Sequence, residues 1–104
     1  MLDLLKKMMT PGDTPNFAEM HANGAKIIDV RTVGEFQSGH INGAKNIPLQ
    51  SLQKEIGRLK KDQTYILCCA SGARSGSATR ILKSEGFENV YNGGGWMMLQ
   101  GKLA

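Results

Sequence analysis

Short apolar runs alternate along this chain with stretches whose apolar residues recur at helical spacing. Residues 25–30 and 64–68 are mostly apolar and rich in β-branched side chains, which predicts two buried strands. Residues 45–48, which end in a proline, and residues 88–91 predict two shorter strands. Strands separated by helical segments are typical of a parallel sheet with helices on both faces.

Capping signals mark where the helices between these strands begin and end. Thr14 precedes a helical stretch as an N-cap, and Gly24 follows it as a stop. Thr32 and Glu35 have the spacing of a capping box, in which each side chain bonds the backbone N–H of the other residue. The other predicted helices cover residues 2–9, 51–60, 75–85 and 96–99. We expect a single α/β domain over residues 1–104, with a central parallel sheet of about five short strands and helices on both faces.

A cysteine stands where the second apolar run gives way to a loop of small residues. The loop consists of Cys69, Ala70, Ser71, Gly72, Ala73, Arg74 and Ser75. Successive backbone N–H groups of such a loop can point inward and bind an anion, and the helix that follows adds the positive end of its dipole. Arg74 adds a full charge, and all three effects favour thiolate over thiol. The loop therefore predicts a nucleophilic Cys69 at the carboxyl end of a strand, where α/β sheets bind ligands.

Two further titratable residues are predicted to be structural. Cys68 continues the central strand, so its side chain should lie in the core, on the face opposite that of Cys69. A redox role as a resolving thiol is the alternative for Cys68. Asp29 interrupts an apolar strand, and a carboxylate there must be paired, with Arg31 as the nearest candidate.

Composition limits the partners that this chain can have. Its 104 residues include 13 Lys or Arg and 9 Asp or Glu, which gives a formal net charge of +4. This mild positive excess favours a small anionic ligand, while the scatter of the basic residues argues against nucleic acid. No apolar stretch approaches the length of a membrane span, and residues 1–7 hold too short an apolar run for a signal peptide. We therefore expect a cytoplasmic protein with no membrane partner and no disulfide between its adjacent cysteines.

Three separated motifs resemble the rhodanese (sulfurtransferase) family in its single-domain form. The motifs are, in order, Ile28–Arg31 with Glu35-Phe36 and Gly39–Pro48, then Cys69–Ser75, then Gly86–Tyr91 with Gly94–Trp96. Their order and spacing over residues 27–96 make the resemblance far more specific than one short motif would be.

This resemblance implies a small α/β domain in which Cys69 cycles between thiolate and persulfide. A donor, typically thiosulfate, would give its outer sulfur to Cys69, and an acceptor such as cyanide or a protein thiol would remove it. Backbone N–H groups from Ala70 to Arg74 would hold the persulfide, and Arg74 would steady the loop or the donor anion. The residues that would support the site by fixing neighbouring loops are Asp29, Arg31 and His40. The resemblance implies no metal and no organic cofactor, and a monomer is expected.

Loop length separates this interpretation from that of related enzymes. Cys69 to Arg74 is six residues, whereas the similar cell-cycle phosphatases and arsenate reductases carry one more, which makes room for a tetrahedral oxyanion. A phosphatase or arsenate reductase is one alternative, and a non-catalytic sulfur-carrier or binding module is another. Ala70 and Ala73 are small and neutral where the family often has a charged or bulky residue. A persulfide or polysulfide is therefore an alternative donor to thiosulfate.

Overall fold

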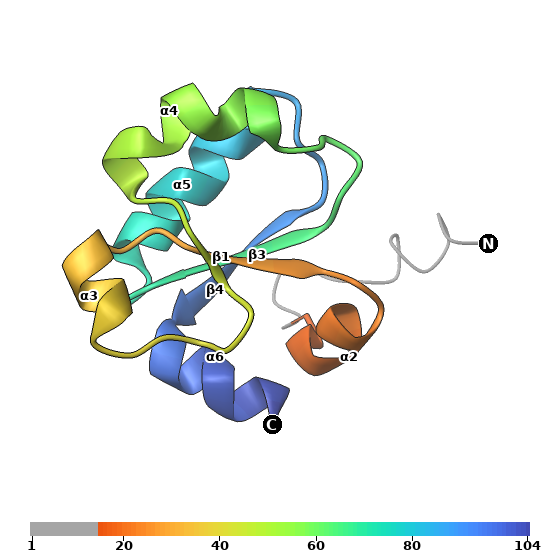
Figure 1. Cartoon of the computed structure of the whole chain (residues 1–104). Coiled ribbons are helices and arrows are strands. Elements are labelled where there is room, and N and C mark those ends of the chain that lie inside the picture. Colours follow the sequence, from red (N-terminus) through yellow and green to blue (C-terminus); the bar gives the residue numbers. More distant parts are fainter. Residues whose placement is uncertain (1–14) are drawn as a thin grey trace.

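The computed structural model describes residues 15–104, which form a four-stranded sheet in the order β2-β1-β3-β4 (Figure 1). The strands are β1 (Lys26–Asp29), β2 (Lys45–Asn46), β3 (Tyr65–Cys69) and β4 (Val90–Gly95). Every neighbouring pair of strands runs parallel. The predicted α/β architecture is confirmed, with four strands where the sequence predicted about five. The helix predicted over residues 2–9 and the cap predicted at Thr14 lie outside the described residues.

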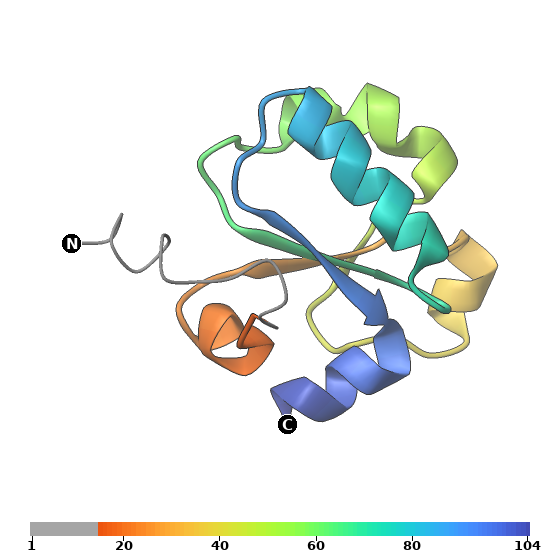
Figure 2. The same cartoon turned by 180° about the vertical axis from the view of Figure 1, so that it is seen from behind.

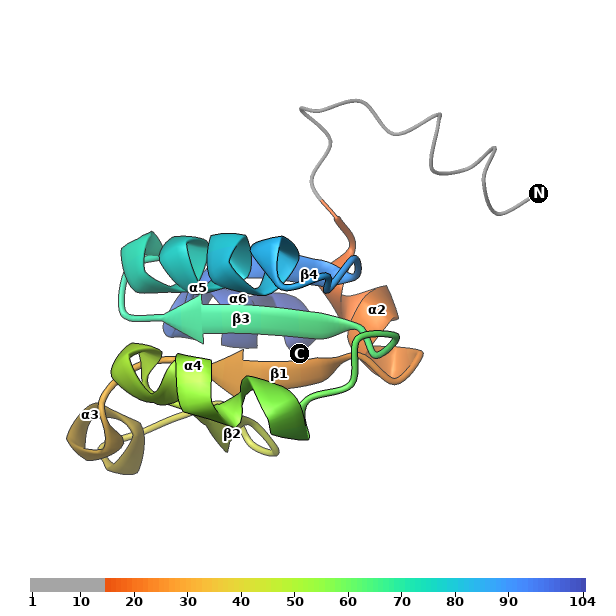
Figure 3. The same ribbon diagram turned by 90° about the horizontal axis from the view of Figure 1, so that it is seen from above.

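Helices cover both faces of the sheet. They are α2 (Phe17–Ala22), α3 (Val33–Gln37), α4 (Leu52–Glu55), α5 (Ala73–Ser84) and α6 (Trp96–Leu103). Two short 3-10 helices, η1 (Leu49–Ser51) and η2 (Ile56–Arg58), flank α4. α4 and α5 lie on one face of the sheet and α2 and α6 on the other, while α3 follows β1 at the carboxyl ends of the strands (Figures 2 and 3).

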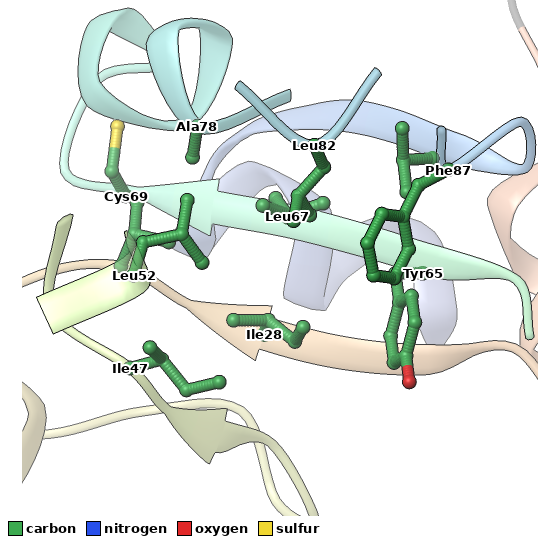
Figure 4. Packing of buried hydrophobic residues seen from close by; sticks show 11 residues of the cluster. Ile28, Ile47, Leu52, Tyr65, Leu67, Cys69, Ala78, Leu82 and Phe87 are labelled. Carbon is green, nitrogen blue, oxygen red and sulfur yellow. The ribbon is translucent and has the colours of Figure 1, made fainter. Parts of the chain in front are cut away.

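Two hydrophobic clusters fill the space between the sheet and its helices, one on each face. The larger cluster lies under α4 and α5 and contains Leu67 and Cys69 (Figure 4). The smaller cluster lies under α2 and α6 and contains Ile66 and Cys68. Neighbouring residues of β3 enter opposite clusters because side chains alternate along a strand. The predictions that Cys68 is buried and lies on the face opposite Cys69 are confirmed.

Several helices differ from their predicted bounds, and α6 extends to Leu103 where the sequence predicted an end at residue 99. The cap of α2 is Asn16, whose side chain accepts a hydrogen bond from the backbone N–H of Glu19. The helix therefore begins two residues later than a cap at Thr14 would require. The helix predicted over residues 51–60 is divided into η1, α4 and η2. Gly57 lies in the last of these pieces, and glycine in a helix interior disfavours a continuous helix by about 1 kcal/mol relative to alanine.

The glycine-rich stretch after Tyr91, which lies between the predicted strand 88–91 and the predicted helix 96–99, is the second half of β4. Its pairing with β3 shifts register between Leu67 and Cys68, so that Gly93 is an extra residue in the strand. A Cβ on Gly93 would lie 2.8 Å from Cγ2 of Ile66. The close approach of β4 to β3 therefore requires a residue without a side chain, which explains how a turn-like sequence forms a strand.

Candidate active site

Cys69 is the last residue of β3, and its sulfur lies inside the turn that leads into α5. The residue is only 1% exposed. The backbone N–H of Gly72 donates a hydrogen bond to Sγ at 2.9 Å, and the hydroxyl of Ser75 lies 3.4 Å from the same atom. α5 begins at Ala73, two residues before its predicted start, so its first turn lies directly beside the sulfur. The loop curls around the thiol in the way that its sequence predicted.

Gly72 makes this turn possible. Its backbone has a φ of +106°, in the left-handed region that favours glycine. A Cβ at Gly72 would also lie 3.3 Å from Cα of Gly94 in β4. The turn that aims the Gly72 N–H at the sulfur and the close approach of β4 both favour glycine at this position.

Hydrogen bonds lower the pKa of the Cys69 thiol below its ordinary value, although the residue is buried. Burial is the largest single influence, and it raises the pKa because it disfavours the charged thiolate. The Ser75 hydroxyl and the backbone N–H groups of Ser75, Gly72 and Ser71 favour the thiolate, and together they outweigh burial. A lowered pKa increases the fraction of thiolate at neutral pH, and the thiolate is the nucleophilic form.

Asn92 on β4 holds the loop from the other side, although no functional role was predicted for it. Its Oδ1 accepts the hydroxyl of Ser75 at 2.6 Å and the backbone N–H of Gly94 at 3.0 Å. Its side-chain amide donates to the carbonyl of Gly72 at 3.2 Å. These bonds tie β4 to the first turn of α5. Nothing local in the sequence signals the contact, because Ser75 and Asn92 are 17 positions apart.

Arg74 forms a bidentate ion pair with Glu35 of α3. Nη1 donates to Oε1 at 2.7 Å, and Nη2 donates to Oε2 at 3.0 Å. Within residues 15–104, the structure shows no hydrogen bond between this guanidinium and the sulfur of Cys69. The contact fits the expectation that Arg74 steadies the loop. The positive charge of Arg74, however, is matched by the Glu35 carboxylate, for which the sequence predicted only a role in helix capping.

Glu35 connects the start of α3 to the cysteine loop. Its Oε1 also accepts the backbone N–H and the hydroxyl of Thr32, both at 3.1 Å, and the predicted capping box is confirmed. The bonds from Arg74, followed by those from Thr32, lower the pKa of Glu35 to about 2. Glu35 therefore stays charged at neutral and mildly acidic pH.

The predicted pair of Asp29 and Arg31 is buried at the carboxyl end of β1. Arg31 Nη2 donates to Oδ2 of Asp29 at 2.7 Å, and Nε lies 3.0 Å from both carboxylate oxygens. Arg31 also donates to the backbone carbonyls of Glu35 at 3.2 Å and Gly39 at 2.7 Å. Its Cζ lies 4.7 Å from the centroid of the Trp96 ring. These contacts hold the segment around α3 in place, as a structural role requires.

His40 and Cys68 also make contacts that fit structural roles. Nδ1 of His40 lies 2.7 Å from the carbonyl oxygen of Phe36, and the two rings stack with 3.7 Å between their centroids. Cys68 is fully buried, and this burial is the main reason that the pKa of its thiol is raised to about 12. A thiol with such a pKa is a poor nucleophile at neutral pH, which argues against a resolving role.

One hollow in the surface of residues 15–104 lies away from the cysteine loop. It has a volume of about 630 Å³, lies at the amino ends of β1 and β3, and includes Lys26, Lys45 and Tyr65 but none of the predicted site residues. Over the same residues, no group of three His, Cys, Asp or Glu side chains is placed to hold a metal ion. No helix in this part of the chain combines the length and the hydrophobicity that crossing a bilayer demands.

The cysteine loop can stabilise negative charge on sulfur. Its N–H donors are already oriented toward Sγ, so they need little reorganisation when charge develops there. The same donors lower the pKa of Cys69 and so increase its thiolate fraction, and a thiolate requires no general base to activate it. The arrangement therefore suits nucleophilic attack by Cys69 and retention of an anionic product on its sulfur.

Comparisons with known proteins match this architecture. The sequence model of the family described as "Rhodanese-like domain" matches residues 14–99. Uncharacterized protein YqhL of Bacillus subtilis (strain 168) is 40% identical over 80 residues, which are 76% of this chain and 64% of that protein, just under two thirds of its length. Thiosulfate sulfurtransferase PspE of Escherichia coli (strain K12) is 39% identical over 70 residues, which are 65% of this chain and 67% of that protein. A solved structure described as "rhodanese with anions from E. coli" is 36% identical with a TM-score of 0.67, and the match covers 71% of this chain and 89% of the other.

Proposed function

Since this chain belongs to the rhodanese-like domain family, we propose that it is a sulfurtransferase that carries sulfur as a persulfide on Cys69. The donor is thiosulfate, a persulfide or a polysulfide, and the acceptor is cyanide or a thiol, including the thiol of a protein. The observation that carries this proposal is the set of N–H and O–H groups directed at the Cys69 sulfur, which favour its thiolate.

The proposed reaction has two half-reactions. The Cys69 thiolate attacks the outer sulfur of thiosulfate, and the new S–S bond forms as the S–S bond of thiosulfate breaks. The bonding electron pair leaves with sulfite, so a thiolate and a dianion become a persulfide anion and a dianion. Cyanide then attacks the outer sulfur of the persulfide, departs as thiocyanate, and restores the thiolate.

The persulfide anion would remain within the loop between the two half-reactions. Its charge would lie near the N–H groups of Ser71, Gly72 and Ser75, and near the positive end of α5. The six-residue loop from Cys69 to Arg74 supports transfer of a single sulfur atom over binding of a tetrahedral phosphate or arsenate. Both cysteines are free thiols, which supports a reducing, cytoplasmic setting.

Intact-protein mass spectrometry after incubation with a sulfur donor tests the proposal. Wild type should gain one sulfur atom from thiosulfate or polysulfide and lose it on addition of cyanide. Cys69→Ser should gain none, and Cys68→Ala, the matched variant at the neighbouring cysteine, should behave like wild type. If wild type gains no sulfur from any donor, the sulfurtransferase assignment is wrong. Turnover of an aryl phosphate or of arsenate would then support the oxyanion-handling alternative, and its absence the binding module.

A further inference from the structure

The guanidinium groups of Arg74 and Arg31 are each matched by a carboxylate. Arg74, inside the loop, is paired with Glu35, and Arg31 is paired with Asp29 at the end of the neighbouring strand. The two pairs contribute no net charge. With Cys69 as a thiolate, the loop and its two ion pairs together carry a charge of −1. Neither of these two guanidinium groups therefore offers an unmatched positive charge to an anion at the loop.

The Glu35 carboxylate is held in its position by more than Arg74. Its Oε1 accepts two hydrogen bonds from Thr32 at the start of α3. The guanidinium of Arg74 uses one nitrogen for each carboxylate oxygen, so turning it toward a donor would break two short hydrogen bonds. Each side chain of the pair is 36% exposed, so water screens the pair only in part.

We infer that the Glu35–Arg74 pair selects the sulfur donor by its charge. On this basis the site takes hydropersulfides (R–S–SH) and other donors with at most one negative charge at the reacting end, in preference to the thiosulfate dianion. Glu35 is thus a specificity-determining residue, although it need not touch the donor. This inference rests on the proposed sulfurtransferase function.

The transfer from a hydropersulfide balances without a further reactant. The Cys69 thiolate attacks the outer sulfur of R–S–SH, and an S–S bond forms as the donor S–S bond breaks. The electron pair of the broken S–S bond stays with the inner sulfur, which also takes the proton of the outer sulfur and leaves as the thiol R–SH. One negative charge is present before the step and one remains afterwards, on the persulfide of Cys69.

The charge of the donor decides how strongly it is repelled. A dianion approaching a site of charge −1 meets about twice the repulsion that a monoanion meets, and an uncharged hydropersulfide meets none of it. Removing the charge of Glu35 while keeping Arg74 would bring the same site to zero net charge. That change should favour thiosulfate over a monoanionic donor by about tenfold at low ionic strength and by less in high salt.

The rate of persulfide formation on Cys69, followed by mass spectrometry with two matched donors, tests this inference. Thiosulfate is a dianion, and methanethiosulfonate is a monoanion with the same type of transferable sulfur. Wild type should react faster with methanethiosulfonate, and faster still with cysteine hydropersulfide. Glu35→Gln should raise the thiosulfate-to-methanethiosulfonate rate ratio about tenfold at low salt. Glutamine is accepted at this position of a capping box, so the variant keeps the start of α3.

Two control variants separate charge from structure. Thr32→Ala weakens the capping box and leaves the Glu35–Arg74 pair, while Glu88→Gln removes an exposed negative charge before β4, at the opposite end of the sheet from the cysteine loop. Both should leave the rate ratio within about twofold of wild type. An unchanged ratio in Glu35→Gln, or equal loss of both rates, would overturn the inference while leaving sulfur transfer established. Failure of every donor to load Cys69 in wild type would overturn the proposed function and this inference with it.

Discussion

Ser75 and Asn92 are joined by a 2.6 Å hydrogen bond between the first turn of α5 and the strand β4. The Ser75 hydroxyl has a single proton, and the sulfur of Cys69 lies 3.4 Å from its oxygen. The hydroxyl can therefore donate to Asn92 or turn toward a charged sulfur. The hydroxyl oxygen lies beside the sulfur in either orientation, so the site has a hydrogen-bond donor available whenever Cys69 becomes negative.

Ser75→Ala should raise the pKa of the Cys69 thiol, because the Ser75 hydroxyl is foremost among the groups that favour its thiolate. A raised pKa leaves less thiolate at neutral pH, so alkylation by iodoacetamide should slow by up to about tenfold there, and the difference should vanish in alkaline solution. The measurement is the alkylation rate as a function of pH. Ser84→Ala, in the exposed last turn of the same helix, is the control. A profile identical to that of wild type would contradict the assignment.

Cys68→Ala should cost stability and spare sulfur transfer. Cys68 is fully buried in the cluster under α2 and α6, so its sulfur leaves a small cavity worth about 1 kcal/mol of unfolding free energy. Urea unfolding measures the first effect, and sulfur uptake from a donor measures the second. Cys69→Ser should show the opposite pattern. Loss of sulfur transfer in a stable Cys68→Ala protein would point instead to two cysteines that act together.

Gly93→Ala should destabilise the fold by about 1–3 kcal/mol, the usual effect of overpacking a core. The added Cβ would lie 2.8 Å from Cγ2 of Ile66 and 2.9 Å from Cδ2 of Leu99. Gly101→Ala, in α6 with no atom within 4 Å of the added carbon, is the control and should stabilise by up to about 1 kcal/mol. The midpoint of urea unfolding separates the two. Equal midpoints would show that β4 moves aside at little cost.

Asp29→Asn should destabilise the protein by about 3–5 kcal/mol, because the Arg31 guanidinium would remain buried without its carboxylate. Sulfur transfer per folded molecule should stay close to that of wild type, since Asp29 bonds Arg31 and not the sulfur. Glu88→Gln, at an exposed carboxylate, is the control. A stable Asp29→Asn protein with slow sulfur transfer would show instead that Asp29 takes part in the sulfur-transfer reaction.

Features that depend on residues close in sequence could be predicted, and those that depend on distant residues could not. The capping box of Thr32 and Glu35, the pair of Asp29 and Arg31, and the opposite faces of the two cysteines follow from spacings of one to three residues. The contact of Glu35 with Arg74 spans 39 positions. The capping box already explains a glutamate at position 35, so nothing in the local pattern indicated that its side chain has a second partner.

Tertiary packing explains the remaining differences between the expected and observed elements. Glycines after Tyr91 are typical of a turn, but here they extend β4 because only glycine fits between Ile66 and Leu99. The stretch 51–60 has helical spacing, yet it is divided near Gly57. In β4, tertiary contacts outweigh the local preference for a turn. In the stretch 51–60, tertiary contacts act together with the local preference of Gly57. A single sequence reveals neither set of contacts.

The glycines of β4 beside the cysteine loop also determine which positions around the site can accept substitutions. Gly95 lies so close that an added Cβ would meet the carbonyl oxygen of Ala70 at 2.9 Å, and Gly93 is equally confined. Ala70 and Ala73, on the outer side of the loop, are exposed and free to vary. Substitutions that change partner preference should therefore accumulate at Ala70 and Ala73, while Gly93 and Gly95 should stay glycine.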